Sequence, residues 1–495
     1  DSYNVAVGDN SGAAVTTGER NTLMGGLSGD ALTDADRNTA IGFAALSTDT
    51  LGSKSTAVGS GALFTQNFTT ATDVFNTAVG FEAGLSITTG INNTLIGALA
   101  GDALTSPNNN VAVGSEALTA DTLGTTSVAI GRSTLKAQNF TTSTSTFNTA
   151  VGFVAGLSIT TGISNTLIGA HAGDALTDAD RNVALGFFAL GDDTLGSRSV
   201  AVGYASLENQ NFTTATNGYN VGLGYNTGAA LTTGVRNTIL GSLALESDTL
   251  GSNSVAVGYA TLNNQNFTTA TDAFNTAVGS LAGLSITTGS HNTLIGAQVG
   301  DALTVGTSNI GVGYAALSSD TKGSKSVAIG RAALNEQNFS TATDSFNVAV
   351  GHEAGLGVTT GIKNVIVGAN AGDALTTGTK NVAIGYLAQS ADTKGFQNIA
   401  IGTAALGSQN FTTEVSSYNI AIGDEAGTSV TTGVQNTIIG GLAGDALTDA
   451  DFNTAMGYLA LSTDTLGSKS TALGYAALKD QNFTTATDSF NVGVG

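Results

Sequence analysis

The chain of 495 residues lacks several residue types, and each absence excludes a class of protein. It has no cysteine, which excludes disulfide frameworks, cysteine-ligated zinc sites and thiol chemistry. It has no tryptophan, one proline and three histidines, and its 16 lysines and arginines are outnumbered by 37 acidic residues. The resulting net charge of −21 argues against nucleic acid as a partner, because phosphates require basic patches.

Motifs that carry catalysis are also missing. The histidines, His171, His291 and His352, stand in different sequence contexts, and no P-loop, Gly-x-Ser-x-Gly elbow or metalloprotease motif is present. No apolar stretch is long enough to span a membrane. We therefore expect a protein that is not an enzyme, uses no cofactor and does not insert into a membrane within this segment.

The dominant feature is a five-residue motif, Asn/Ser-x-x-apolar-Gly, which occurs 28 times between Asn4 and Gly495. Successive motifs start 17, 17, 17 and 21 residues apart, which gives a super-repeat of 72 residues. Such periods are typical of solenoids, in which each repeat contacts only its neighbours. We call each repeat a coil, number its positions from the motif Asn or Ser, and call the 21-residue repeats long coils.

One super-repeat, residues 220–274, is only 55 residues long, so it has lost one complete coil without a change of phase downstream. Nearest-neighbour stacking tolerates such a loss, whereas a globular core does not. We therefore interpret residues 1–495 as a single continuous repeat array. Because no capping repeat is recognisable, we expect this array to be an excerpt of a longer chain.

Each motif combines strand residues with a glycine turn. Position 4 is always Val, Ile, Leu or Met, position 3 is mostly Ala, position 2 is mostly Thr or Val, and position 5 is always Gly. Such residues favour strands, and Gly turns the chain readily with φ above zero. No stretch between the glycines keeps a helical period. The sequence predicts an all-β parallel β-solenoid, or β-roll, of about 28 coils with two or three short strands per coil.

Stacked coils place equivalent side chains about 4.8 Å apart in ladders. We expect a buried amide ladder of Asn4, Asn21, Asn38 and their equivalents, with Ser in most long coils. A representative coil has four large apolar side chains that should be buried, namely Ile41, Phe43, Leu46 and Leu51. The burial of four apolar side chains stabilises a coil by less than the conformational entropy that is lost when its 17 residues are ordered. We therefore expect further burial between chains, in a homotrimer or another bundle, and keep a single-chain rod as the alternative.

The segments Asn38–Gly42 and Ser127–Gly131, together with the Thr-Thr-Gly turns, resemble the repeats of trimeric autotransporter (YadA-like) adhesin heads and related phage tail-fibre proteins. The resemblance covers essentially the whole chain. It implies left-handed parallel β-rolls assembled as trimers. The chain differs from that family in its longer coils, and it lacks a coiled-coil stalk, a membrane anchor and a chaperone segment.

Two acidic columns recur along the array. Both are explained by aspartates that hydrogen-bond to the backbone of their own turns. Calcium is the alternative, with Asp34 and Asp36 and their equivalents as ligands, although the nonapeptide calcium pattern is absent. The columns are Asp30, Asp102, Asp174, Asp301, Asp373 and Asp445, and Asp49, Asp121, Asp193, Asp248, Asp320, Asp392 and Asp464.

The long coils carry the most specific chemical signal. Each contains Gln-Asn-Phe-Thr/Ser, whose Asn begins an N-glycosylation sequon and is expected on a projecting loop. The alternative is an unmodified turn asparagine. The candidate sites for N-linked glycans are Asn67, Asn139, Asn211, Asn266, Asn338, Asn410 and Asn482.

Each long coil also ends in an aromatic residue, which suggests packing under the inserted loop or against a neighbouring chain. These residues are Phe75, Phe147, Tyr219, Phe274, Phe346, Tyr418 and Phe490.

These features favour an extracellular or cell-surface structural fibre that is not an enzyme, has other copies of itself as partner and carries N-linked glycans. An adhesin or phage tail-fibre shaft that binds a host surface is the alternative. An ice-binding solenoid is a third hypothesis, which would require a flat threonine ladder on every coil.

Overall fold

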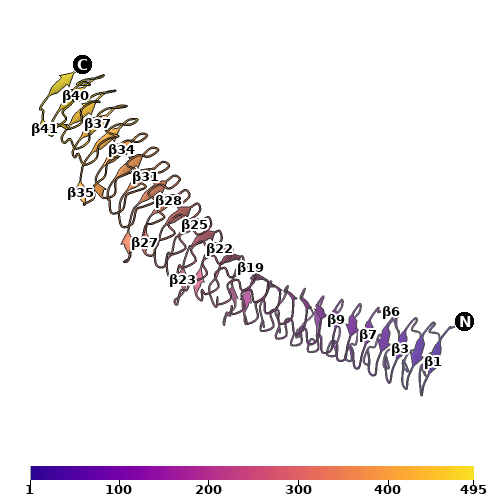
Figure 1. The fold of residues 1–495 in the computed structure, drawn as a ribbon. Coiled ribbons are helices and arrows are strands. Elements are labelled where there is room, and N and C mark those ends of the chain that lie inside the picture. Colours follow the sequence, from indigo (N-terminus) through magenta and orange to yellow (C-terminus); the bar gives the residue numbers. More distant parts are fainter. Residues whose placement is uncertain (1) are drawn as a thin grey trace. The chain divides into compact units, whose positions relative to one another are not determined.

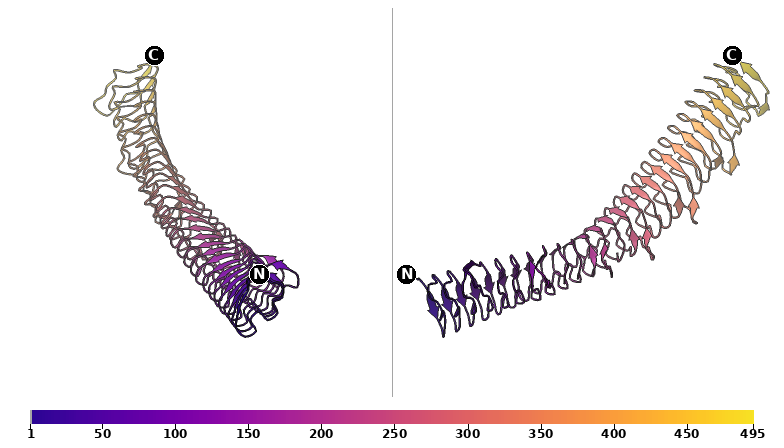
Figure 2. Two further views of the ribbon diagram at one scale, coloured as in Figure 1. Left: turned by 90° about the vertical axis from the view of Figure 1, so that its right-hand side faces the viewer. Right: turned by 180° about the vertical axis from the view of Figure 1, so that it is seen from behind.

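The computed structural model describes residues 2–495 and shows a parallel β-solenoid of about 29 turns, with no helix in this range. The predicted all-β solenoid is therefore confirmed. The chain divides into two compact units, Asp1–Leu243 and Ala244–Gly495. Within each unit the coils lie one above the next (Figures 1 and 2). The division falls inside the coil that starts at Asn237, where the short super-repeat has lost its coil.

One three-residue strand, at positions 2–4, occurs in every coil. In the first unit these strands are β1 (Val5–Val7), β2 (Thr22–Met24), β3 (Thr39–Ile41), β5 (Thr56–Val58), β7 (Thr77–Val79), β8 (Thr94–Ile96), β9 (Val111–Val113), β11 (Val128–Ile130), β13 (Thr149–Val151), β14 (Thr166–Ile168), β15 (Val183–Leu185), β17 (Val200–Val202), β19 (Val221–Leu223) and β20 (Thr238–Leu240). In the second unit they are β22 (Val255–Val257), β24 (Thr276–Val278), β25 (Thr293–Ile295), β26 (Ile310–Val312), β28 (Val327–Ile329), β30 (Val348–Val350), β31 (Val365–Val367), β32 (Val382–Ile384), β34 (Ile399–Ile401), β36 (Ile420–Ile422), β37 (Thr437–Ile439), β38 (Thr454–Met456), β40 (Thr471–Leu473) and β42 (Val492–Val494).

Two-residue strands form a second, short pairing between each long coil and the coil before it. They are β4 (Gly52–Ser53), β6 (Thr72–Asp73), β10 (Gly124–Thr125), β12 (Thr144–Ser145), β16 (Gly196–Ser197) and β18 (Thr216–Asn217) in the first unit. They are β21 (Gly251–Ser252), β23 (Thr271–Asp272), β27 (Gly323–Ser324), β29 (Thr343–Asp344), β33 (Gly395–Phe396), β35 (Val415–Ser416), β39 (Gly467–Ser468) and β41 (Thr487–Asp488) in the second.

The strands pair in parallel and in register, so that Thr22 of β2 lies beside Thr39 of β3. The prediction of two or three strands per coil is confirmed for half of the coils, because 14 coils have the three-residue strand and one two-residue strand. The other 14 coils have only the three-residue strand, and the rest of each coil is a run of turns. Non-glycine residues adopt positive φ in these turns, among them Ala44 (54°), Leu46 (52°) and Lys54 (66°). This use of the left-handed region by ordinary side chains is not visible in the sequence.

The motif glycine lies at a corner, as predicted. Gly186 has φ of +140°, and a Cβ built on it would lie 2.3 Å from the carbonyl oxygen of Gly203, the equivalent glycine of the next coil. Glycine is therefore required twice, for its backbone conformation and for the close approach of the neighbouring coil.

The core is thinner than predicted. In the coil that starts at Asn38, only Leu46 of the four expected large side chains is fully buried, and Leu51 is half-buried. Ile41 and Phe43 are 36% and 62% exposed, so the prediction that they are buried is wrong. Strand alternation explains the first error, because positions 2 and 4 point away from the core when position 3 points into it.

The predicted asparagine ladder is present and buried, and it is built mainly from bonds between side chains and backbone. Asn38 Oδ1 accepts a bond from the backbone N–H of Ser55 in the next coil (2.8 Å), and Asn38 Nδ2 donates to the carbonyl of Gly52 in its own coil (2.9 Å). Each ladder amide therefore bonds its own coil to the next coil, and it also bonds two segments of its own coil to each other.

Candidate functional site

The outward face of the long sheet is apolar in both units, except for threonine at position 2 of 13 coils. Position 3 of the strand is buried, whereas position 2 is half-buried in most coils and position 4 is half-buried or exposed. Across all 28 coils position 2 is only Thr, Val or Ile, and position 4 is only Val, Ile, Leu or Met. Examples at position 4 are Met24, Ile168 and Ile295, which are 43%, 37% and 42% exposed. We call positions 2 and 4 together the outward face.

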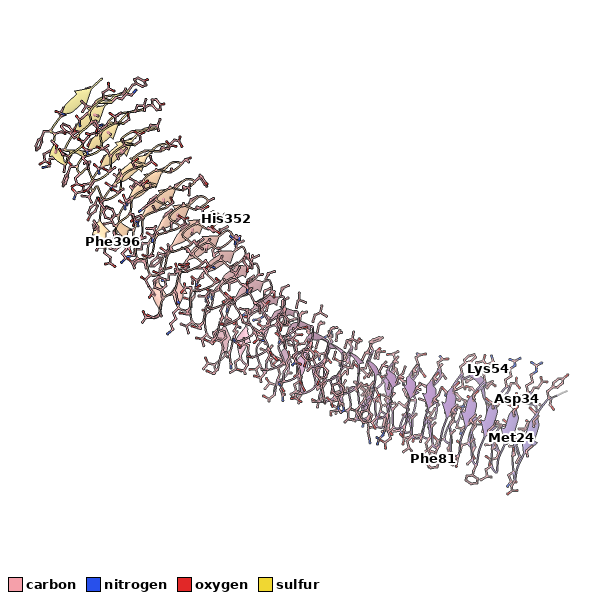
Figure 3. All side chains as sticks on the ribbon, in the orientation of Figure 1. Met24, Asp34, Lys54, Phe81, His352 and Phe396 are labelled. Atoms are coloured by element: carbon pink, nitrogen blue, oxygen red, sulfur yellow. The ribbon has the colours of Figure 1, made fainter. Side chains whose placement is uncertain are left out.

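The outward face has two different edges, because every coil enters the strand from the same side. Position 17 precedes the strand and forms the leading edge, and positions 6–11 follow the glycine corner and form the trailing edge. Lys54 of the leading edge and Phe81 of the trailing edge project from opposite sides of the first unit (Figure 3). His352 at position 6 and Phe396 beside the leading edge do the same in the second unit (Figure 3).

Aromatic rings extend the apolar surface onto the trailing edge. Phe187, Tyr204 and Tyr225 occupy position 6 of three successive coils and stack, with ring centroids 5.6 and 5.4 Å apart. They are 41–51% exposed. Their edges therefore project from the wall, and their faces are covered by one another.

The sequon asparagines are exposed or half-buried, but they lie in the wall of the solenoid and not on the loop. Asn67 donates its backbone N–H to the carbonyl of Thr88 (2.9 Å), and its Oδ1 accepts a bond from Thr50 Oγ1 (3.2 Å). The insertion follows the sequon Phe68, whose ring is buried, and projects at residues 69–71 before β6 pairs with β4. The prediction that these asparagines project on the loop is therefore wrong in detail.

Position 13 forms a hydroxyl ladder that the sequence reasoning missed. Thr33 Oγ1 donates to the carbonyl of Thr50 (3.1 Å), and the equivalent residues of other 17-residue coils repeat this bond. Asn67 and its equivalents continue this column in the long coils, because Thr50 donates to them. The signal was in the sequence, since position 13 is Thr in every 17-residue coil.

The aromatic residue that ends a long coil lies beside a cation in four of the seven long coils. Lys54 Nζ is 5.1 Å from the ring centroid of Phe75 and 2.5 Å from Asp73 Oδ2. The same contacts recur at Lys325 and Lys469. Phe75 is 53% exposed, so packing under the inserted loop is wrong. Packing against a neighbouring chain stays a prediction.

A buried polar network occupies each long coil. Asp49 accepts bonds from the backbone N–H groups of Gly52 and Phe68 (both 3.0 Å) and from Gln66 Nε2 (2.6 Å). Gln66 Nε2 also lies 3.0 Å from Ser55 Oγ, and Gln66 Oε1 accepts a bond from Asn76 Nδ2 (2.9 Å). The Ser and Gln pair thus replaces the ladder asparagine that six of the seven long coils lack.

These aspartates confirm the predicted turn role, since each accepts a bond from the N–H three residues onward. Burial raises the pKa of the Asp49 carboxyl, while the bond from the Gln66 amide lowers it. All three partners are donors, which suits a carboxylate and not a carboxylic acid.

The other predicted sites are not assembled. Asp34 Oδ1 accepts a bond from Thr17 Oγ1 (2.5 Å), and Asp36 Oδ1 accepts one from the Glu19 N–H (2.7 Å). Among residues 2–495, no group of three or more metal-ligating side chains is present, and no cleft or cavity is found. The described residues also include no helix long and apolar enough to cross a membrane.

His171 is the one histidine in an aromatic cluster. Its Nδ1 lies 2.8 Å from Asp174 Oδ2, and its ring contacts Phe153, Phe187 and Phe188. No equivalent cluster surrounds His291 or His352 in the described chain.

No family model matches the chain, and no curated protein sequence is similar to it.

Proposed function

We propose that the chain is an extracellular structural fibre whose copies associate side by side through the outward face. The observation that carries this proposal is the composition of the outward face. No charged residue, amide or glycine occurs at positions 2 and 4 in any coil, although these side chains point away from the chain's own core. A surface that stays in water tolerates charged and amide side chains, so their complete exclusion favours a surface that another chain covers.

The area of the outward face suits such an interface. Fourteen coils that rise about 4.8 Å each, with a face about 10 Å wide, present about 700 Å² per unit. A stable interface buries about 800 Å² on each partner. The two units of one chain therefore offer enough apolar area for a partner, without any contribution from the edges.

Side-by-side association also supplies the burial that each coil lacks. Ile41 and Phe43 leave the core of their own coil incomplete, and covering an exposed aliphatic side chain contributes about 1 kcal/mol or more per coil. Because the same positions repeat in every coil, small contributions add along the array. Another copy of this chain is the partner that matches this repeat.

The long coils would carry N-linked glycans in this fibre. The Nδ2 atom of Asn67 has no protein partner, and the sequon Thr69 is exposed. A glycan on Nδ2 would leave Oδ1 free to accept the bond from Thr50. Because the sites form a column away from the outward face in each unit, sugars there would hydrate the fibre and limit its lateral growth.

Sedimentation equilibrium tests the association, with variants in which aliphatic side chains of the outward face become charged. The test variant is Val58→Lys, Val79→Lys and Ile96→Lys, at position 4 of three successive coils. The matched control is Thr70→Lys, Thr89→Lys and Ser106→Lys, at exposed residues of the same three coils that lie outside the outward face. We expect oligomers for the wild type and the control and a monomer, or a much weaker oligomer, for the test variant. A wild type that stays monomeric at all concentrations would contradict the proposal.

A further inference from the structure

The two edges of the outward face differ in charge in both units. On the trailing edge, positions 6–11 carry eight acidic and two basic residues in the first unit, and nine acidic and two basic residues in the second. On the leading edge, position 17 of the 17-residue coils carries six Lys or Arg residues in the first unit, four in the second, and no acidic residue. The leading-edge residues are Arg20, Arg37, Lys54, Arg181, Arg198, Arg236, Lys325, Lys363, Lys380 and Lys469.

The acidic residues behind the leading edge reduce but do not reverse this difference. From position 13 to the end of each coil the chain carries 12 basic and 12 acidic residues. Some of these are paired, as Lys54 is with Asp73. The leading side is therefore neutral overall, whereas the trailing edge carries a net charge of −13 from 17 acidic and 4 basic residues.

Two copies that meet through their outward faces can run in the same or in opposite directions. In a parallel pair, a rotation about the long axis places the leading edge of each copy beside the trailing edge of the other. In an antiparallel pair, the trailing edges meet each other, and so do the leading edges. The apolar positions 2 and 4 are compatible with either direction, so only the edges distinguish them.

We propose that copies of this chain associate in parallel, with the leading edge of one copy beside the trailing edge of the next. The antiparallel arrangement is disfavoured because it brings two acidic edges together, and the parallel arrangement brings position 17 cations close to carboxylates such as Glu82 and Glu425. This inference rests on the proposed association through the outward face. It adds a direction to the fibre, which an apolar surface alone does not give.

The preference depends on ionic strength. Packed sheets lie about 10 Å apart, so charges on facing edges are separated by about one Debye length at physiological salt. Like-charge repulsion between acidic edges is therefore felt at low salt and screened at high salt. Apolar association is not weakened by salt in this way. The direction of association therefore depends on salt concentration, whereas the affinity of the apolar contact does not fall with salt, so the two can be measured separately.

The absence of cysteine allows unambiguous spin labelling. Ser2→Cys and Thr485→Cys each place one label on an exposed residue near one end of the chain. Dipolar electron paramagnetic resonance is measured on Ser2→Cys alone and on a mixture of the two labelled chains, at low salt. Parallel association predicts a short label-to-label distance in Ser2→Cys alone. Antiparallel association predicts a short distance only in the mixture.

Charge variants test the cause. Asp9→Lys, Glu82→Lys, Asp424→Lys and Glu425→Lys reduce the trailing-edge charge from −13 to about −5, and we expect them to allow antiparallel pairs. Asp34→Lys, Asp178→Lys, Glu414→Lys and Asp449→Lys are the control, because they change as many charges behind the leading edge. We expect the control to stay parallel.

The outcomes separate this inference from the proposal on which it rests. If the chain forms oligomers but the label-to-label distance is short only in the mixture of Ser2→Cys and Thr485→Cys chains, the parallel direction is overturned. The fibre proposal then still stands. A monomeric mass for the unlabelled chain would overturn both. A parallel wild type whose trailing-edge variant stays strictly parallel at low salt would overturn the electrostatic cause.

Discussion

Asn398 breaks a rule that the other long coils follow, and replacing it should stabilise the protein. Every other long coil starts with Ser, and Asn398 is the exception. Its buried Nδ2 has no hydrogen-bond partner, and neither has Oε1 of the nearby Gln389. In the equivalent coil of the same unit, Ser326 Oγ accepts a bond from Gln337 Nε2 (2.9 Å) and contacts Ser345 Oγ. Asn398→Ser should restore that arrangement with Gln409 and Ser417.

The size of the effect follows from the bonds that change. An unpaired buried amide costs about 1–3 kcal/mol, and a regained bond between Gln409 and the new serine adds about 1 kcal/mol. Against this, the substitution removes the bond from the Asn419 N–H to Asn398 Oδ1 (3.1 Å). We expect a net increase of about 1 kcal/mol in the free energy of local opening. This corresponds to about fivefold slower amide exchange.

Native-state hydrogen exchange is the assay, because the opening of one coil in a repeat array need not change the global melting temperature. Amides of β32, β34 and β36 should exchange about fivefold more slowly in Asn398→Ser, in line with an increase of about 1 kcal/mol. Ser326→Asn is the matched control, since it creates the same orphaned amide and should accelerate exchange in its own coils. Faster exchange in Asn398→Ser would refute the reasoning.

Three further predictions concern other parts of the coil. Gly186→Val should lower thermal stability strongly, by about 3 kcal/mol or more, because its Cβ would meet the Gly203 carbonyl at positive φ; Gly191→Ala, at ordinary φ, should cost less, and equal melting curves would contradict this. Burial raises the pKa of Asp121, so the folded chain holds its proton more tightly than the unfolded chain, and the unfolding free energy should increase as pH falls from neutral through that raised pKa. This increase in the unfolding free energy, measured by urea denaturation at each pH, should be smaller in Asp121→Asn. Glycopeptide mass spectrometry of native material should find hexosamine-containing mass on Asn67, and unmodified peptides at all seven sequons would leave only their role in the threonine column.

Much of the fold was predictable because the repeat leaves few alternatives. A motif that ends in Gly 28 times fixes the coil length, the strand position and the corner, and the structure confirms each of them. The ladder of Asn38 and its equivalents was also predictable, because stacking in register places identical amides above one another. The bonding partners were not, since the turn that brings the Gly52 carbonyl to Asn38 uses left-handed backbone at ordinary residues.

The direction of side chains was the main error. Ile41 and Phe43 were predicted to be buried because they are large and apolar. Burial in a strand is decided by alternation, so Ile41 points outward because Ala40 points inward, and Phe43 lies in the turn after the strand. In most coils the small residue at position 3 marks the inside and the large aliphatic residue at position 4 marks the outside. Position 3 is a buried Leu or Ile in the coils of Leu23, Leu95 and their equivalents. Reading the alternation from Ala would have predicted the outward face from the sequence alone.

Mass per unit length in solution tests the central proposal most directly. One chain of 48.9 kDa in 28 coils has about 1.7 kDa per coil, or about 1.7 kDa for each 4.8 Å of rise. Small-angle X-ray scattering of the cross-section gives this quantity without reference to the overall shape. Side-by-side association predicts an integer multiple of at least two, which end-to-end association does not change. A value equal to that of one chain, at concentrations where sedimentation finds oligomers, would contradict association through the outward face.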